Sequence, residues 1–136
     1  MNKNDFIYDA DHKVFTAIIN GMEISIDKED MTDKALSLAE RVLSEYPKKF
    51  AMITDYLSKD ESIIIFYNSV SKEEIGENLG VPIIRIDETG GVLSYCDHKF
   101  DHVHIIDLEF GGALEELYGV SIDGWLILGR IFVMMK

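Results

Sequence analysis

The chain contains one cysteine among its 136 residues, so it cannot form an internal disulfide. Its first residues lack the long apolar run that a secretory signal has, and together these two absences favour a reducing cytoplasm. The longest apolar run extends from Trp125 to Met135 and is interrupted by Gly129 and Arg130. It is shorter than the roughly 20 residues that a membrane-spanning helix needs.

Basic residues are scarce, with 13 Lys and Arg against 25 Asp and Glu, which gives a net charge of −12 at pH 7. Nucleic acids and anionic membranes would be repelled by this charge, so a basic protein is the expected partner. Between Asp87 and Asp123 there are nine acidic residues and one basic residue, Lys99. This acidic region is either a docking face or a solvated surface that serves solubility.

Catalytic signatures are also missing. The pairs at residues 90–91 and 111–112 are glycines, but each joins predicted strands and neither opens a helix as a phosphate-binding loop does. Cys96 and His98 lie two residues apart, whereas a reactive thiol and its base generally come from different elements of a fold. We therefore expect Cys96 to be a small buried residue and the protein to lack enzymatic activity.

The residues that are present predict one α+β domain spanning residues 1–136, because 47% hydrophobic residues suffice for one core. Apolar and polar residues alternate from Met22 to Ile26, which predicts a half-buried strand. The dipeptide Asn20-Gly21 favours a tight hairpin between this strand and residues 14–19. A short strand at residues 6–8 is expected to join the hairpin.

Helical periodicity replaces this alternation from Thr32 to Tyr46, and we expect Pro47 to end that helix and to open a second one at residues 48–57. Ser71 and Glu74 form a capping-box pattern that predicts a third helix over residues 72–79, ending at Gly80. Residues 63–70 are apolar without a clear period, so strand and buried coil both remain open for them.

The remaining segments are strand-like and separated by tight turns. The predicted strands cover residues 82–87, 92–96, 102–110, 114–122 and 125–134, with turns at 89–91, 111–112 and 123–124. Consecutive strands joined by such turns predict an antiparallel meander. The expected fold is therefore an antiparallel sheet with an N-terminal β-hairpin and two or three helices packed on one face.

Three of the four histidines lie between Cys96 and His104. His102 and His104 would share one face of a strand and, with Asp97, His98 or Asp101, could bind Zn²⁺. A metal-binding hydrolase or sensor domain is therefore the alternative hypothesis. The competing interpretation is structural, because the same face continues into apolar residues, and our main hypothesis includes no cofactor.

The apolar segment from Trp125 to Met135 is expected to form a final strand, since nine of its eleven residues are large and apolar. An exposed apolar edge strand invites pairing with other chains. We therefore expect this strand to be buried within the monomer or in a homodimer contact.

The order of these segments carries a resemblance. An N-terminal hairpin and an amphipathic helix precede Ser-Lys-Glu-Glu-Ile, Gly-Val-Pro-Ile-Ile-Arg-Ile-Asp, His-Val-His-Ile-Ile-Asp-Leu-Glu-Phe and Val-Ser-Ile-Asp-Gly. Over residues 14–124 the chain resembles a group of small bacterial domains of unknown function, some of which resemble immunity proteins encoded beside polymorphic toxins. This resemblance implies a non-enzymatic protein that neutralises a toxin by occluding it, and it implies no catalytic residue.

These observations converge on a cytoplasmic protein that binds a basic partner through an acidic sheet surface, with exposed aromatic side chains as anchors. The candidate contact residues are Asp97, Asp101, Asp107, Glu109, Tyr118, Asp123 and Trp125.

Overall fold

The structure of the chain is a computed structural model that describes residues 1–128 and 131–135, with the backbone alone described from residue 125 onward. Within these residues, eight strands form one sheet in which each strand lies beside its neighbour in sequence. The strands are β1 (Ile7–Asp9), β2 (Val14–Ile19), β3 (Met22–Asp27), β4 (Ile83–Ile86), β5 (Gly90–Tyr95), β6 (His104–Gly111), β7 (Glu116–Leu128) and β8 (Ile131–Met135).

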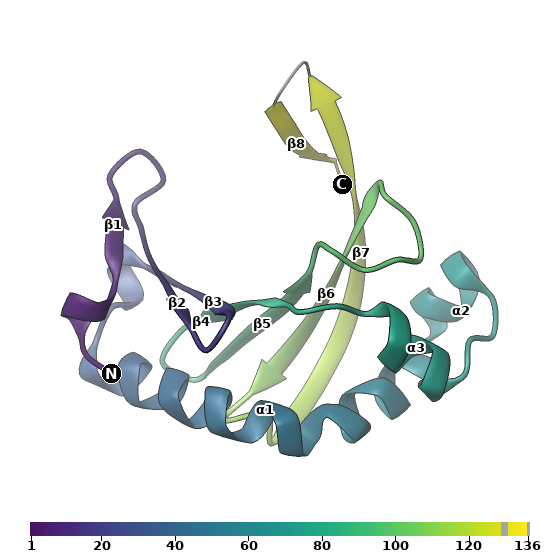
Figure 1. Cartoon of the computed structure of the whole chain (residues 1–136), viewed down its shortest axis with the longest axis horizontal. Coiled ribbons are helices and arrows are strands. Elements are labelled where there is room, and N and C mark those ends of the chain that lie inside the picture. The colour runs from purple at the N-terminus through teal and green to yellow at the C-terminus, as the bar shows by residue number, and fades with distance from the viewer. Residues whose placement is uncertain (129–130, 136) are drawn as a thin grey trace.

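The three α-helices all lie in the connection between β3 and β4. They are α1 (Asp33–Lys59), α2 (Glu61–Tyr67) and α3 (Lys72–Asn78), and 3₁₀ turns cover Lys3–Asp5 and Lys28–Asp30. Figure 1 shows α1 running beneath one face of the sheet, with α3 packed on it and α2 near β7. The α+β fold and the N-terminal hairpin are therefore confirmed. None of the described helices is both long and apolar enough to cross a membrane.

One strand pair departs from the predicted antiparallel meander. Strands β3 and β4 are parallel, with Ile24 opposite Ile84, whereas every other neighbouring pair is antiparallel. The helical connection carries the chain back to the end of the sheet where β3 began, so the next strand has to run in the same direction.

The N-terminal hairpin forms as predicted. Asn20 and Gly21 have φ angles of 53° and 80°, and Ile19 pairs with Met22 across the turn. Two consecutive residues with positive φ define a type I′ turn, whose twist matches that of the flanking strands.

The expectation that Pro47 ends the first helix is wrong, because α1 continues through it to Lys59. A proline inside a helix removes one backbone hydrogen bond and costs about 3 kcal/mol. Beyond the proline, however, Ile53 and Leu57 are fully buried, and each such side chain contributes about 1.5–3 kcal/mol. Packing in the core, where α3 contacts this part of α1, therefore stabilises one long helix.

The two shorter helices begin at capping residues. Residues 63–67, for which strand and coil were both open, are helical and complete α2. Its cap Asp60 accepts hydrogen bonds from the backbone of Ser62 and Ile63. The predicted third helix is confirmed as α3, and Ser71 accepts a hydrogen bond from the backbone of Glu74.

The predicted turn at residues 123–124 is wrong. Strand β7 passes straight through this dipeptide, with Asp123 opposite Ile105 and Gly124 opposite His104 on β6. Pairing with a neighbouring strand overrides the local turn preference. Within the predicted final strand, residues 125–128 consequently complete β7 and residues 131–135 form the separate strand β8. Their side chains lie outside the described residues, so burial of this segment or a homodimer through it stays a prediction.

The core lies between α1 and one face of the sheet. Its members include Ile24, Ile84, Leu93 and Leu108, none of which is exposed. The core also contains a polar contact, in which the Tyr46 hydroxyl of α1 lies 2.8 Å from that of Tyr95 on β5. Burial raises the pKa of Tyr46 to about 12 and also raises the pKa of Tyr95, so both hydroxyls stay protonated at neutral pH.

Gly91 offers a test of how tightly β4 and β5 are joined. A Cβ atom at this position would lie 1.9 Å from the carbonyl oxygen of Arg85, which is backbone and cannot rotate away. We expect Gly91→Ala to lower the free energy of unfolding by at least about 2 kcal/mol in urea titrations. Gly119 on β7 has nothing within 4 Å of the corresponding position, so Gly119→Ala should be neutral or slightly stabilising. Equal stability of the two variants would contradict the tight β4–β5 geometry.

Candidate functional site

The histidine and aspartate residues near His104 form a hydrogen-bonded clasp instead of a free cluster. The Tyr67 hydroxyl at the end of α2 donates to Asp101 Oδ2 over 2.8 Å, and His104 Nδ1 lies 2.8 Å from the same oxygen. Asp101 Oδ1 accepts hydrogen bonds from the backbone of Val103 and His104. The clasp, defined as Tyr67, Asp101 and His104, joins α2 to the β5–β6 loop.

His98 is buried inside this loop, with 3% of its surface exposed. The Phe100 backbone donates to Nδ1 over 3.2 Å, so Nδ1 is the acceptor, and Nε2 donates to the His104 carbonyl over 2.7 Å. Both ring nitrogens are therefore occupied. The rings of Tyr67 and Phe100 pack around His98, with centroids 6.0 and 5.8 Å away. His98 thus acts as a packing and hydrogen-bonding residue.

The other members of the predicted metal site do not join them. Strand β6 begins at His104, so His102 lies in the loop and is exposed instead of sharing a strand face with His104. Asp97 is also exposed in the loop. Within residues 1–128 and 131–135, no group of three or more His, Cys, Asp and Glu side chains is placed to hold a metal ion.

Cys96 is exposed, contrary to the expectation that it is a small buried residue, because it follows the last residue of β5. Partial burial of its sulfur and the nearby charge of Asp107 raise the pKa of its thiol. The thiolate is the nucleophilic form, so this environment disfavours a reactive cysteine.

The clasp should make stability depend on acid pH. Burial raises the pKa of Asp101, but hydrogen bonds from Tyr67 and His104 outweigh this and lower it to about 2. Because its pKa is lowered in the folded state, ionised Asp101 stabilises the fold at pH values above the pKa of about 4 that it has in the unfolded chain. This stabilisation is lost as the pH falls towards about 2. We expect Asp101→Asn to lower the free energy of unfolding by about 1–2 kcal/mol at pH 7, with the difference shrinking below pH 4.

Urea titrations at pH 7 and pH 3 measure this difference. Asp11→Asn, which removes an exposed carboxylate from the β1–β2 loop, is the matched control and should change stability little at either pH. If Asp101→Asn lowered the free energy of unfolding equally at pH 7 and pH 3, the ionised form of Asp101 would not be what stabilises the fold.

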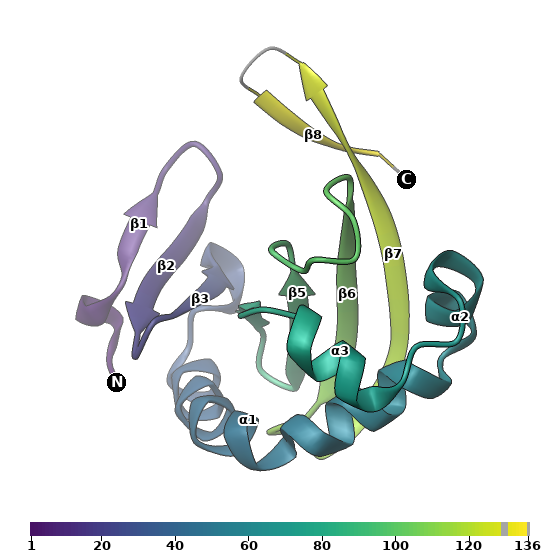
Figure 2. The ribbon, with the colours of Figure 1, turned by 45° about the vertical axis from the view of Figure 1, so that its right-hand side comes forward.

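No helix covers the face of the sheet opposite α1, which is called the open face. The sheet bends so that the β1–β2 and β7–β8 hairpins rise on either side of this open face (Figures 1 and 2). Strand register and alternation with the core residues place the following side chains on it: Ile7, Val14, Thr16, Ile18, Glu23, Ser25, Asp27, Ile83, Arg85, Val92, Ser94, Ile105, Asp107, Glu109, Ser121 and Asp123.

A groove of about 640 Å³ crosses the open face over β2, β3, β4 and β5. Its lining consists of His12, Val14, Thr16, Glu23, Ser25, Asp27, Asp30, Ile83, Arg85, Ile86, Asp87, Gly91 and Val92. Carboxylates crowd one end of it, where burial and the charges of Asp27 and Asp87 raise the pKa of Asp30. Arg85 is the one lysine or arginine in this lining. The groove therefore has a strongly negative field.

The predicted contact residues divide between two places. Asp107, Glu109 and Asp123 lie on the open face, and exposed Tyr118 lies at its end, where its ring approaches Gly111. Asp101 belongs to the clasp and Asp97 to the loop, while the Trp125 side chain lies outside the described residues.

Sequence reasoning missed the groove residues Glu23, Asp27 and Arg85 as site residues. The alternation in residues 22–26 indicated that the polar side of this strand faces water. It did not show that β4 lies beside this strand, because that pairing joins segments more than 50 residues apart, as Glu23 opposite Ile83 shows.

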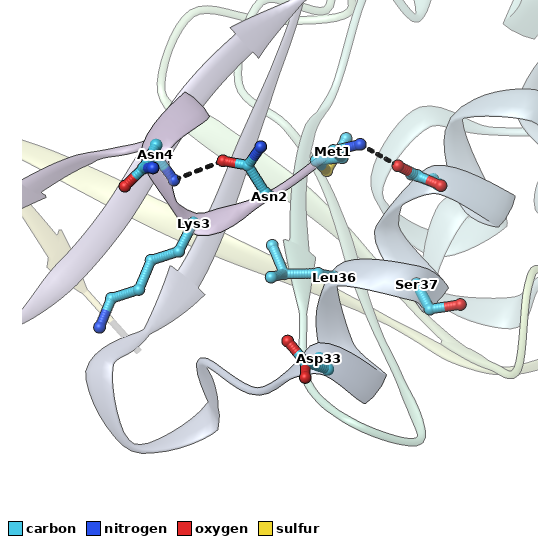
Figure 3. A pocket seen from close by; sticks show the side chains of 8 residues that line it. Met1, Asn2, Lys3, Asn4, Asp33, Leu36 and Ser37 are labelled. Atoms are coloured by element: carbon cyan, nitrogen blue, oxygen red, sulfur yellow. Dashed lines mark hydrogen bonds and ion pairs between the residues drawn. The ribbon is translucent and has the colours of Figure 1, made fainter.

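A second hollow, of about 460 Å³, lies where the N-terminal 3₁₀ turn meets α1 (Figure 3). The Met1 amino group pairs with Glu40 of α1, and the Asn2 side chain accepts a hydrogen bond from the backbone of Asn4 over 2.8 Å. These polar groups form an ion pair and a hydrogen bond with one another. The residues around the hollow therefore hold the first residues of the chain against α1.

Comparison of the chain with protein-family models, curated proteins and solved structures finds no match.

Proposed function

We propose that this protein is a non-enzymatic binding protein that docks a basic protein partner on the open face of its sheet and blocks it by occlusion, as immunity-type proteins block toxins. The observation that carries the proposal is the open face itself, which is concave, uncovered by helices and lined by carboxylates around the single Arg85. A surface of this shape and charge complements a convex basic surface.

The charge distribution supports rapid recognition of such a partner. The whole chain carries −12, and at the groove burial and then the repulsion from Asp27 and Asp87 raise the pKa of Asp30. A cationic partner relieves this repulsion, and opposite charges accelerate encounter by up to several orders of magnitude at low salt.

Apolar side chains at the margins of the open face supply contacts of a different kind. Ile7 and Ile18 are 78% and 75% exposed on the β1–β2 hairpin, and Tyr118 is 60% exposed at the opposite end. Large apolar and aromatic side chains provide most of the binding free energy in many protein interfaces. The open face thus combines a charged centre with apolar margins.

The residues that the sequence suggested for metal binding or catalysis support a role in protein binding instead of catalysis. The hydrogen bonds of His98 and of the Asp101–His104 pair hold the β5–β6 loop in place, and Tyr67 of α2 donates to Asp101. The raised pKa of Cys96 keeps its thiol protonated. We therefore propose no catalytic residue.

Neutralising the groove tests the proposal. The double variant Glu23→Gln/Asp27→Asn removes two carboxylates of the open face that have no ion pair with a described residue. With a basic toxin encoded by a neighbouring gene as partner, we expect the association rate constant at low salt to fall about tenfold, because steering charge is lost. Stopped-flow or surface plasmon resonance measures this rate.

The matched control is Glu73→Gln/Glu77→Gln, which removes two exposed carboxylates from α3 on the helical side. The control should associate within about twofold of the wild-type rate. Equal slowing of both variants, or undiminished protection of toxin-expressing cells by a groove variant that no longer binds, would contradict docking through the open face.

A further inference from the structure

Two neighbouring polar side chains on the open face lack hydrogen-bond partners. Ser94 of β5 and Asp107 of β6 are directly opposite each other in the strand register. Ser94 has no exposed surface, and its Oγ, like the buried Asp107 Oδ1, has no hydrogen-bond partner. In the described part of the chain these are the two buried side-chain atoms left in this state.

An unsatisfied buried polar atom destabilises a fold, so native proteins keep few of them. An ionised carboxylate can only accept hydrogen bonds, and a serine hydroxyl can accept as well as donate. Neither atom receives a hydrogen bond from a donor in the structure, and a positively charged donor would both supply one and compensate the charge of Asp107.

The surroundings of the pair select a cation over a neutral donor. Asp107 forms no ion pair with any residue that the structure describes, and neither does Arg85. Burial and, after it, the negative charges of Asp107 and Asp97 raise the pKa of the nearby Cys96 thiol more than the positive charge of Arg85 lowers it, and Glu23 adds a smaller negative contribution. The pair therefore lies in a net negative field.

The position of the pair connects it with the groove. Ser94 is directly opposite Ile83, which lines the groove, and it lies two residues from Val92, another lining residue on the same face. Cross-strand neighbours have Cβ atoms about 5 Å apart. Asp107 is half-buried, so a terminal amino or guanidinium group can approach its carboxylate from the open face, and it contacts Ser94 once the atoms over this buried side chain move aside.

We propose that Ser94 and Asp107 form the receptor site for one cationic side chain, a lysine or an arginine, of the basic partner. The inference rests on the proposed function and names the point on the open face where that partner is recognised. Asp107 accepts charge-assisted hydrogen bonds from the inserted group, and Ser94 Oγ accepts a further one.

Removing a binding residue whose hydrogen bonds are unsatisfied in the free protein should stabilise the free protein and weaken binding. Ser94→Ala removes the unpartnered hydroxyl, so it should raise the melting temperature of the free protein by about 3–5 °C. The same change should weaken binding of a cationic peptide about threefold to tenfold, because one acceptor is lost. A purely structural serine would not improve stability and impair binding together.

The probes are short peptides that alternate threonine with lysine, with arginine or with glutamine, titrated at low ionic strength into the full chain and followed by NMR and calorimetry. Asp107→Asn should raise the dissociation constant of a cationic peptide about tenfold or more. Of the lysine and arginine peptides, the one whose dissociation constant rises more in Asp107→Asn identifies the inserted cation. The glutamine peptide should show no Asp107-dependent binding.

Glu109→Gln is the matched control, since it removes the same charge from an exposed position two residues along β6. It should raise the dissociation constant by no more than about threefold. Equal losses in Asp107→Asn and Glu109→Gln would overturn the specific site and leave a diffuse acidic face, as would a Ser94→Ala variant of unchanged or lowered melting temperature. Failure of both cationic peptides to bind the wild-type chain would instead overturn the proposed function as well.

Discussion

The packing of α1 against one face of the sheet is the constraint on which the rest of the structure depends. Its inward side chains, among them Val42, Ile53 and Leu57, are fully buried in the core that α1 shares with the sheet and with α3. This contact is strong enough to keep the helix continuous through Pro47. Because α2 and α3 follow α1 on the same side, it also decides which face of the sheet remains uncovered.

The two faces of the sheet therefore have different physical roles. Towards α1 the strands present a nearly uninterrupted apolar surface, while away from it they alternate carboxylates, hydroxyl groups and isolated aliphatic residues. One face accounts for stability, and the other can carry repulsive charges because it does not need to pack. A fold with helices on both faces would leave no place for the crowded carboxylates around Asp30.

Local signals in the sequence predicted those features whose causes are local. The turn at Asn20-Gly21, the cap at Ser71 and the periodicity of α1 before the proline depend on neighbouring residues alone. The course of α1 beyond Pro47 and of β7 through Asp123 depends on distant partners, which the sequence pattern does not reveal.

The same distinction applies to the site. Acidic residues between Asp107 and Asp123 were recognisable as a candidate surface, but their proximity to Glu23 follows from the β3–β4 pairing. The pairing of Ser94 with Asp107 is likewise a matter of register. The one available signal was a serine between Leu93 and Tyr95 of a predicted strand. The number of histidines in and next to the β5–β6 loop suggested a metal site, but the hydrogen bonds of His98 and His104 explain the positions of these two side chains.

The parallel contact between β3 and β4 has a consequence for the order in which the molecule assembles. On one side of this contact lies the β1–β3 unit and on the other the β4–β8 unit, and each is built from strands adjacent in sequence. Pairings between adjacent strands close short loops and form early, whereas joining β3 to β4 must close the entire helical connection and forms late. The groove spans this junction, with Glu23 and Ser25 on one side and Ile83 and Arg85 on the other. We therefore expect the groove to form in the last folding step, so that an incompletely folded chain presents only half of it.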